Sequence, residues 1–218
     1  MALDEEQMKK LVEGFRRSAL FLIVAIAAYT GMRRNEILAL RWSDLDTEKK
    51  ILRVRRALEQ TKGNIGFKPP KTKRGIRDID IEERLVELLS AERDRFLRLK
   101  AGIVDNSGAV DLSLLKLADD ALIFPSFAGP KSDFTRPRDP RAVTRAFTKL
   151  AGKLGFPGLR FHDLRGSHGT QLLRRGVPVD VVARRLGHDP YTLLKSYAKE
   201  IATDKDRISK ELAGMVAL

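Results

Sequence analysis

Two arginines and two histidines of this chain stand in short polar motifs whose side chains could bind and activate a phosphate. The motif "TGMRRNEILAL" carries Arg33, and "FHDLRGSHGT" carries His162 and Arg165 three residues apart, on one face of a predicted helix. A third motif, "LGHDPYTLLKSYAKE", adds His188. Each motif alone is a weak signal, because a His-x-x-Arg pair occurs by chance in many helices. Together they predict a site rich in guanidinium and imidazole groups.

Phosphoryl transfer is the chemistry that such a site could support. A phosphodiester under attack builds negative charge on its non-bridging oxygens, and the planar guanidinium of arginine matches that geometry and stays charged. Without a metal, the site also needs a nucleophile and a proton source for the leaving oxygen. Tyr191 and Tyr197 follow His188, and a cationic pocket would help to ionise a phenol whose free pKa is about 10. Either tyrosine could be the nucleophile, and either could instead pack in the core.

The motifs of other catalytic chemistries are missing. His162 and His168 are six residues apart, off a common helix face and without a suitable carboxylate between them, so we expect no zinc site. The sequence has no phosphate-binding G-x-x-x-x-G-K-[ST] loop and no serine nucleophile elbow. It has no cysteine, which excludes disulfides and thiolate metal sites. We therefore expect neither a metal nor another cofactor.

The charge of the chain indicates a polyanionic partner. Lys and Arg number 42 against 29 Asp and Glu, a formal net charge of +13. Residues 51–80 carry nine basic and three acidic side chains, and residues 121–160 carry eight and two, whereas residues 81–120 are net acidic. Such blocks indicate a basic face, for which nucleic acid is the natural partner. Charge alone does not separate DNA from RNA, or either from a merely solvated basic surface.

Hydrophobic periodicity predicts a mainly α fold with a small antiparallel β-sheet. Asp4 is a helix N-cap, and the apolar run that follows Ala19 predicts a buried helix that ends at Gly31. Residues 50–58 alternate apolar and basic side chains, as a half-buried strand would, and residues 61–81 are rich in turn formers. Further helices are predicted at 33–40, 82–100, 141–154, 162–175, 178–186, 190–198 and 204–217. Residues 101–120 are predicted to form an inserted loop with one helical turn, and "ALIFPS" a short buried extended segment.

The three motifs closely resemble those of the tyrosine site-specific recombinases, the phage integrase family. The order Arg, Lys, His-x-x-Arg, Leu-Gly-His and Tyr runs across residues 30–197, and the combination is far more specific than any part of it. The resemblance implies a tyrosine recombinase catalytic-domain fold. It places the family's first arginine on Arg33 rather than Arg34. It also places the nucleophile on Tyr197, nine residues after His188.

The resemblance also implies the role of each catalytic residue. Tyr197 would attack the scissile phosphate to give a 3′-phosphotyrosyl link and a free 5′-hydroxyl. Lys73, on a β-hairpin, would protonate the leaving oxygen, with Lys71 as the alternative. The 5′-hydroxyl of a second strand would then reverse the reaction without ATP or metal. Arg33, Arg165 and His188 would bind the phosphate, and His162 would bind it or accept the phenol proton.

The other polar and aromatic residues receive simpler predictions. We expect contacts to the DNA backbone from Lys71, Arg74, Arg136, Arg138, Arg141 and Arg145. Glu36 is expected to orient the neighbouring arginine or helix rather than to react, and Arg34 to be a surface or helix-face charge. His168 is interpreted as structural or as a DNA-backbone contact. Tyr29, Tyr191 and Trp42 are expected to pack.

The implied function is DNA strand exchange in site-specific recombination or integration, on double-stranded DNA, as a tetramer on two duplexes. Two alternatives are relaxation of the type IB topoisomerase kind and a catalytically inactive basic DNA-binding protein. We expect residues 1–218 to be one catalytic domain, a monomer by itself, that lacks the family's N-terminal core-binding domain. Its tail, 204–218, would pack on its own domain or on a neighbour. The longest apolar run is ten residues, too short to cross a bilayer, and no signal peptide precedes it, so a bacterial cytosolic or nucleoid location is expected.

Overall fold

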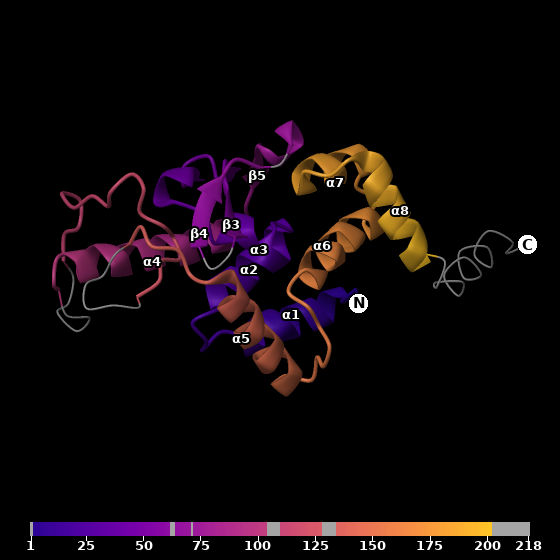
Figure 1. Ribbon diagram of the computed structural model, residues 1–218, viewed down its shortest axis with the longest axis horizontal. Helices are drawn as coiled ribbons and strands as arrows, with labels where there is room; N and C mark the ends of the chain where they lie inside the picture. Colours follow the sequence, from indigo (N-terminus) through magenta and orange to yellow (C-terminus); the bar gives the residue numbers. More distant parts are fainter. Residues whose placement is uncertain (1, 62–63, 71, 104–109, 128–133, 202–218) are drawn as a thin grey trace, which may run out of the picture.

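The fold is mainly helical, with two small antiparallel sheets. The computed structural model describes residues 2–61, 64–70, 72–103, 110–127 and 134–201, with only the backbone for 196–201. Helices α2 and α3 lie at the centre, α4 extends to one side, and α6, α7 and α8 lie on the other (Figure 1). The predicted fold class is therefore confirmed.

The N-terminal helices start and stop where local chemistry predicts. Helix α1 (Glu5–Gly14) begins at Asp4, whose carboxylate accepts a hydrogen bond from the Gln7 amide while the Gln7 side chain accepts one from the Asp4 amide. Helix α2 (Phe21–Thr30) is apolar on every side, is largely buried, and ends at Gly31 with φ +66°. The α2–α3 turn is therefore held inside the core.

Helix α3 (Arg34–Ile37) is shorter than the predicted 33–40 helix. The chain leaves the helix because the Leu40 carbonyl accepts a hydrogen bond from the Ile123 amide, and the Trp42 amide donates one to the Ala121 carbonyl. These bonds draw the backbone toward the buried extended segment "ALIFPS". A short 3-10 helix, η1 (Trp42–Asp44), follows. A contact 80 residues away in sequence thus overrides the helical pattern.

The predicted strand 50–58 is divided in two. Strands β1 (Leu45–Asp46), β2 (Ile51–Val54) and β5 (Arg77–Asp80) form one antiparallel sheet, in which Leu52 pairs with Ile79. Strands β3 (Ala57–Thr61) and β4 (Asn64–Lys68) form a separate hairpin. The division at residues 55–56 occurs because β2 runs out of partner strand, so that the chain pairs with its own return strand instead.

The other helices that the structure describes agree with the prediction within a few residues. They are α4 (Glu83–Lys100), α5 (Pro140–Lys153), α6 (Asp163–Arg174), α7 (Val179–Leu186) and α8 (Pro190–Ile201). Within the described parts of the predicted loop 101–120 there are turns but no helix. The predicted 204–217 helix lies outside the described residues. Among those described, no helix is both long and apolar enough to span a membrane.

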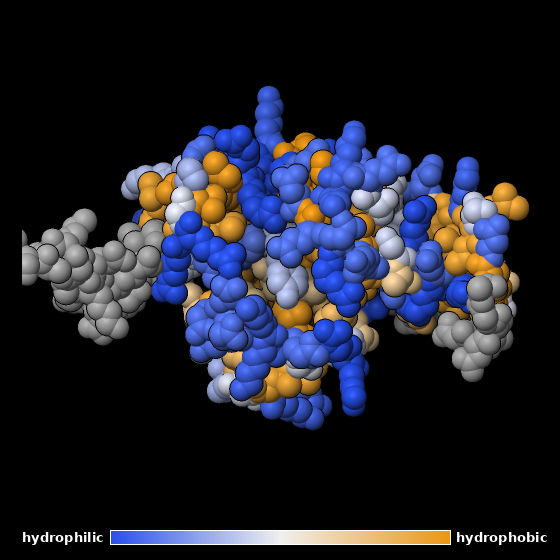
Figure 2. Space-filling view, turned by 180° about the vertical axis from the view of Figure 1, so that it is seen from behind, coloured by the Kyte–Doolittle hydropathy of each residue, from blue (hydrophilic) through white to orange (hydrophobic). Residues whose placement is uncertain are grey.

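One of the three aromatic residues predicted to pack is buried in the core. Trp42 is buried and makes an edge contact with Phe96, with ring centroids 5.6 Å apart. The prediction is wrong for Tyr29 and Tyr191, which are 45% and 74% exposed. Tyr29 lies in the last turn of α2 beside a surface hollow, and Tyr191 in the first turn of α8, where Leu193 faces inward instead. Figure 2 shows that hydrophilic residues cover most of the face opposite to Figure 1, with smaller hydrophobic patches between them.

Candidate active site

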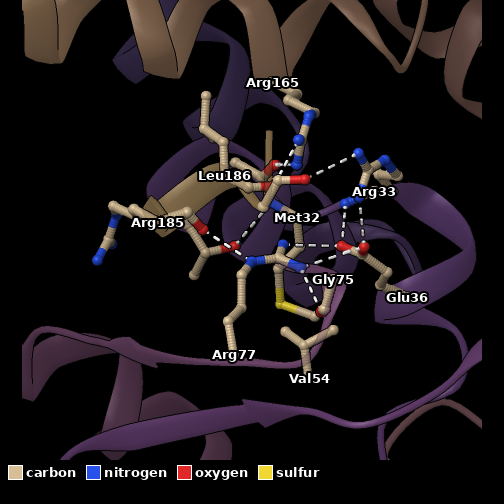
Figure 3. A network of polar contacts seen from close by, with 12 residues as sticks. Met32, Arg33, Glu36, Val54, Gly75, Arg77, Arg165, Arg185 and Leu186 are labelled. Atoms are coloured by element: carbon tan, nitrogen blue, oxygen red, sulfur yellow. Dashed lines mark hydrogen bonds and ion pairs between the residues drawn. The ribbon is translucent and has the colours of Figure 1, made fainter. Parts of the chain in front are cut away.

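The C-terminus of helix α7 is the meeting point of three arginines. Three consecutive main-chain carbonyls, at residues 185–187, accept hydrogen bonds from Arg77 Nε (2.8 Å), Arg165 Nη2 and Arg33 Nη2 (3.5 Å), in that order (Figure 3). The last carbonyls of a helix have no partner within it and carry the negative end of its dipole. They therefore suit guanidinium groups, and they bring together arginines from β5, α6 and the α2–α3 turn.

Gly187 makes this arrangement sterically feasible. It ends α7 in the left-handed region, with φ +66°. A Cβ atom at this position would lie 2.9 Å from the Arg74 carbonyl oxygen and 3.1 Å from Arg77 Nη1. Both the backbone conformation and the close packing of Arg74 and Arg77 exclude a side chain at this position. The glycine of the Leu-Gly-His motif is thus required by the arginine cluster itself.

The Glu36 carboxylate fixes two of the three arginines. It is 3% exposed and accepts hydrogen bonds from Arg33 Nη1 at 2.8 Å and from Arg77 Nη2 at 2.9 Å. Burial opposes ionisation of Glu36, but the hydrogen bonds and charges of Arg77 and Arg33 outweigh it and lower its pKa. The prediction that Glu36 orients the neighbouring arginine is confirmed, and it orients Arg77 as well.

Arg165 is buried with unused hydrogen-bonding capacity. It is 2% exposed, and its Nη1 donates to the Gly31 carbonyl at 2.7 Å. Its Nε has no hydrogen-bond partner among the described residues. Burial and then the charge of Arg33 lower the pKa of Arg165 to about 9, so it remains charged at neutral pH. A buried N–H group of a charged side chain that has no acceptor costs free energy unless a bound anion accepts its hydrogen bond.

The cluster therefore carries excess positive charge. In the part of the chain that the structure describes, Arg33, Arg77 and Arg165 face a single carboxylate, that of Glu36. Among the described residues, no three His, Asp or Glu side chains come together as metal ligands would. Within the described part of the chain, an incoming anion would thus be met by guanidinium groups, the donors that match phosphate geometry best.

Both predicted active-site histidines are neutral at neutral pH. Burial, followed by the charges of Arg165 and Arg33, lowers the pKa of His188 to about 4. Burial and then Arg165 also lower the pKa of His162, which stands at the start of α6. The Nδ1 atom of His188 is buried and has no hydrogen-bond partner among the described residues. Each imidazole can therefore donate one hydrogen bond and accept one.

A cleft of about 860 Å³ opens beside the cluster. Arg33, His188 and Lys73 all line it. Lys73 is exposed and begins the short 3-10 helix η2 (Lys73–Gly75), which follows the β3–β4 hairpin, so its predicted position on a hairpin is wrong. Lys71 lies outside the described residues. Arg74 forms an ion pair across the cleft with Asp189, directly after His188. The structure thus brings the predicted lysine segment to the same cleft as Arg33 and His188, whereas Arg165 and His162 are not among the residues that line it.

Tyr197 lies in the C-terminal half of α8, and its side chain is not among those described. With a rise of about 1.5 Å per residue, it stands about 10 Å along the helix from Pro190. Tyr191 is in the first turn of the same helix and is exposed. The two tyrosines are therefore well separated along one element.

The predicted DNA-contacting arginines fall into two groups. Arg136, Arg141 and Arg145 are exposed around the N-terminus of α5. Arg138 is half-buried, and its guanidinium donates to the Pro125 and Ala19 carbonyls at 3.1 Å each. Arg138 is therefore bonded within the protein. The exposed Arg136, Arg141 and Arg145 are better candidates for the expected phosphate contacts.

Arg34 departs from its prediction as a surface charge. It is half-buried and bonds Thr144, and Gln60 bonds the Asp139 carboxylate at 3.4 Å. These contacts join α3 and the β3–β4 hairpin to the first turns of α5. The exposed arginines of α5 therefore flank the hairpin that borders the cleft.

His168 lies behind the cluster, and Arg77 is one of its three arginines. His168 is 8% exposed and hydrogen-bonded on both ring nitrogens, to the Ala28 carbonyl at 3.0 Å and to Arg185 Nε at 3.1 Å, which supports its structural interpretation. Arg77 was not predicted as a site residue. The available signal was its strand position, since in β5 the side chains of Arg77 and Ile79 face the same buried side. A buried arginine inside a strand is a site candidate.

The fold and the cluster define a basic domain in which buried arginines lie beside a cleft. The phage integrase family matches residues 2–203, and the chain belongs to this family. It is 34% identical over 198 residues to a "Tyrosine recombinase XerC-like" protein of Caldanaerobacter subterraneus subsp. tengcongensis, covering 85% of this chain and 46% of that protein. It is 28% identical over 203 residues to "Tyrosine recombinase XerA" of Saccharolobus solfataricus, covering 93% of this chain and 53% of that one.

Solved structures share the fold. The crystal structure of XerA recombinase superposes with a TM-score of 0.63 and 24% identity, covering 94% of this chain and 63% of the other. The Tn1549 transposon integrase in complex with transposon right end DNA gives a TM-score of 0.70 and 17% identity, covering 96% and 66%. At such identities the likeness establishes the architecture. The chain spans about half the length of the curated relatives named above.

Proposed function

We propose that this chain cleaves and rejoins double-stranded DNA as the catalytic domain of a site-specific recombinase, through a covalent 3′-phosphotyrosyl intermediate. The observation that carries the proposal is the arginine cluster, in which, among the residues that the structure describes, three guanidinium groups face one carboxylate and the buried Arg165 Nε has no partner. A scissile phosphate would supply the missing negative charge and acceptor oxygens.

The first chemical step is attack by Tyr197 on the scissile phosphorus. A bond forms between the phenol oxygen and phosphorus, and the bond from phosphorus to the 5′-oxygen breaks. Lys73 gives its proton to the departing 5′-oxygen, with Lys71 as the alternative donor. Arg33 and Arg165 bind the non-bridging oxygens, where negative charge accumulates in the transition state. Attack by the 5′-hydroxyl of another strand reverses each bond change, so no ATP or metal is required.

The neutral histidines have distinct tasks. His188 donates its single N–H to the phosphate, and His162 accepts the phenol proton as Tyr197 attacks. The lowered pKa of both imidazoles supports this assignment, because it leaves a lone pair available at neutral pH. The positive charges that lower these pKa values are the same ones that would favour ionisation of the tyrosine.

Double-stranded DNA is the proposed partner, contacted by the exposed arginines of α5 and by the hairpin beside the cleft. The structures of relatives that contain DNA, such as the Tn1549 integrase bound to transposon right end DNA, support this partner. We propose action in the bacterial cytosol as a tetramer on two duplexes.

A nicked suicide duplex of the cognate site tests the proposal. Cleavage beside the nick releases a short 5′-hydroxyl strand, so the covalent protein–DNA product cannot be resealed and accumulates as a slow band in a denaturing gel. We expect this band in the presence of a metal chelator and without ATP. Tyr197→Phe should abolish it, and Tyr191→Phe is the matched control on the same helix.

Three outcomes would contradict the proposal. No band from the folded wild-type protein would favour a DNA-binding protein without catalysis. A band that persists in Tyr197→Phe would move the nucleophile elsewhere. A strict requirement for Mg²⁺ in the cleavage step would contradict the metal-free mechanism.

A further inference from the structure

We infer that Arg185 is a positioning residue for the reaction. It joins the C-terminus of α7 to α6 and β5, which carry Arg165 and Arg77, and to the last turn of α2, which precedes Arg33. The inference rests on the proposed function, because the reaction it serves is DNA cleavage. Its basis is a set of side-chain contacts that lies outside the cleft and that neither the family's motifs nor the proposed chemistry uses.

All three nitrogens of the Arg185 guanidinium are engaged with different elements. Nε donates to His168 Nε2 on α6 at 3.1 Å. Nη1 donates to the Asp80 carbonyl at the end of β5 at 3.0 Å. Nη2 donates to the Tyr29 carbonyl in the last turn of α2 at 3.1 Å. One planar group therefore joins α7 to α6, β5 and α2, a geometry that lysine could not reproduce.

Each attachment point lies close to an arginine of the cluster. His168 is three residues after Arg165 on α6, and Asp80 is three residues after Arg77 on β5. Tyr29 is two residues before Gly31, whose carbonyl accepts the Arg165 Nη1 bond. The Arg185 main chain takes part as well, since its carbonyl accepts the bond from Arg77 Nε.

His168 provides a rigid acceptor for this contact. Its Nδ1 donates to the Ala28 carbonyl at 3.0 Å, which leaves the Nε2 lone pair free to accept from Arg185. A Cβ at Gly31 would lie 2.8 Å from His168 Cδ2, so the imidazole also packs directly on the α2–α3 turn. Burial and then the charge of Arg185 lower the pKa of His168 to about 4, so the acceptor persists at neutral pH.

Arg185 acts through other residues because it lies on the opposite side of the α7 terminus from the cleft. It lines a separate hollow of about 1050 Å³, together with His168 and Tyr29, and is not among the residues that line the 860 Å³ cleft. Figure 3 shows its guanidinium pointing away from Arg33, Arg77 and Arg165. We therefore expect it to affect the alignment of the cluster rather than to contact DNA.

The kinetic test compares Arg185→Ala with Arg184→Ala in the suicide-substrate assay. Arg184 is the adjacent residue of α7 and its side chain is 77% exposed; of the described residues it pairs only with Asp180, one turn away. With saturating DNA, we expect the cleavage rate of Arg185→Ala to fall about 100-fold, because small misplacements of catalytic groups cost this much. DNA affinity should change little in either variant, and Arg184→Ala should cleave like the wild type.

Arg185→Lys keeps the charge and most of the aliphatic stem, and it carries the test if Arg185→Ala does not fold. A lysine ammonium presents all of its donors from one nitrogen at the end of a flexible stem, so it cannot reproduce contacts made by three nitrogens of a planar fork. We therefore expect Arg185→Lys to retain the thermal stability of the wild type while its cleavage rate still falls at least tenfold, roughly the lower part of the range for a misaligned site. Full activity in a folded Arg185→Lys protein would overturn the inference.

A substrate with a methylphosphonate at the scissile position separates alignment from general damage. This group lacks one anionic oxygen, so its cleavage depends less on guanidinium groups. If Arg185 aligns the cluster, the rate defect of Arg185→Ala should shrink on the methylphosphonate. An equal defect on both substrates would show that the arginines are not the route of its effect, and would contradict the inference.

An NMR measurement tests the inference without activity. The arginine Nε–Hε signals of Arg77 and Arg165 report on the hydrogen bonds and burial of these groups. They should shift, and exchange with water faster, in Arg185→Lys but not in Arg184→Ala. Unchanged signals would overturn the positioning role even if the enzyme is active. If the wild type forms no covalent product while these signals respond, the proposed function fails and the structural coupling stands.

Discussion

Arginines occur in two contrasting regions of this molecule. At the end of α7, Arg77 and Arg165 are 7% and 2% exposed, and every contact fixes their orientation. Around the start of α5, Arg141 and Arg145 are exposed side chains. The first kind of site sets geometry before a ligand arrives, whereas the second supplies charge that adapts to it. We therefore expect the buried arginines to govern rate and the exposed ones to govern affinity.

Loss of the Glu36 charge should have the largest effect, because it leaves Arg33 and Arg77 without their shared carboxylate. For Glu36→Gln we expect the free energy of unfolding to fall by about 3 kcal/mol or more, as when one partner of a buried ion pair is removed. Urea denaturation measures this change. The control is Glu87→Gln, whose 52% exposed side chain pairs with Arg84 on the surface of α4 and should cost less than about 1 kcal/mol. Equal losses in the two variants would remove the distinction between the regions.

Arg165→Ala should separate rate from binding. We expect the cleavage rate to fall about 100- to 1000-fold, as when one donor to transition-state charge is removed. DNA affinity should change far less, because the contribution of this group is concentrated in the transition state. Single-turnover cleavage and equilibrium binding check the two quantities. Arg174→Ala, at the end of the same helix, is the control, and matching losses in rate and affinity would argue against a preorganised cluster.

Acid should lower the free energy of unfolding through His168, which lies behind the cluster. His168 has a folded pKa of about 4, below the unfolded value of about 6.5, so the unfolded chain binds the proton first. Its contribution to stability is therefore complete above about pH 6.5 and is lost as the pH falls toward 4, on the order of 3 kcal/mol in total. Thermal unfolding across this range measures the slope. His168→Gln, which cannot titrate, should give a flatter profile, and an unchanged slope would contradict this prediction.

Substitution of an exposed arginine should have the smallest effect. For Arg145→Ala we expect DNA binding to weaken by about tenfold or less, with a salt dependence reduced by about one counterion. The cleavage rate at saturating DNA should stay close to that of the wild type. Binding titrations at several salt concentrations test this, with Arg141→Ala as a parallel case. A loss of rate at saturation would place α5 in the catalytic machinery instead.

The helices of the second half could be predicted from the sequence because their signals are local. The apolar spacing in α5, α6 and α7 and the glycines between them define each element without knowledge of its neighbours. The prediction failed where a distant segment competes with the local pattern. Helix α3 stops early because residue 40 bonds the segment near residue 123, and Tyr29 is exposed although it ends an apolar helix.

The candidate site divides in the same way. Arg33, His162, Arg165 and His188 could be named because each lies in a short motif with a recognisable order along the chain. Arg77 was not named, because its one signal is a strand position in phase with Ile79, and that position does not by itself separate a buried arginine from a solvated one. Arg138 shows the opposite case, since a basic loop residue turns out to bond main-chain carbonyls inside the protein.

The sequence by itself determined the class of chemistry, the mainly helical architecture and the motif residues, because residue types and their periodicity are properties of the local chain. Only the tertiary structure decided which groups meet. It brought three arginines from separate elements to three successive carbonyls of α7, paired two of them with Glu36, and placed Arg185 behind them. Burial, and with it the shifted pKa values and the unmatched positive charge, depends on contacts between segments up to about 150 residues apart, which no local pattern encodes.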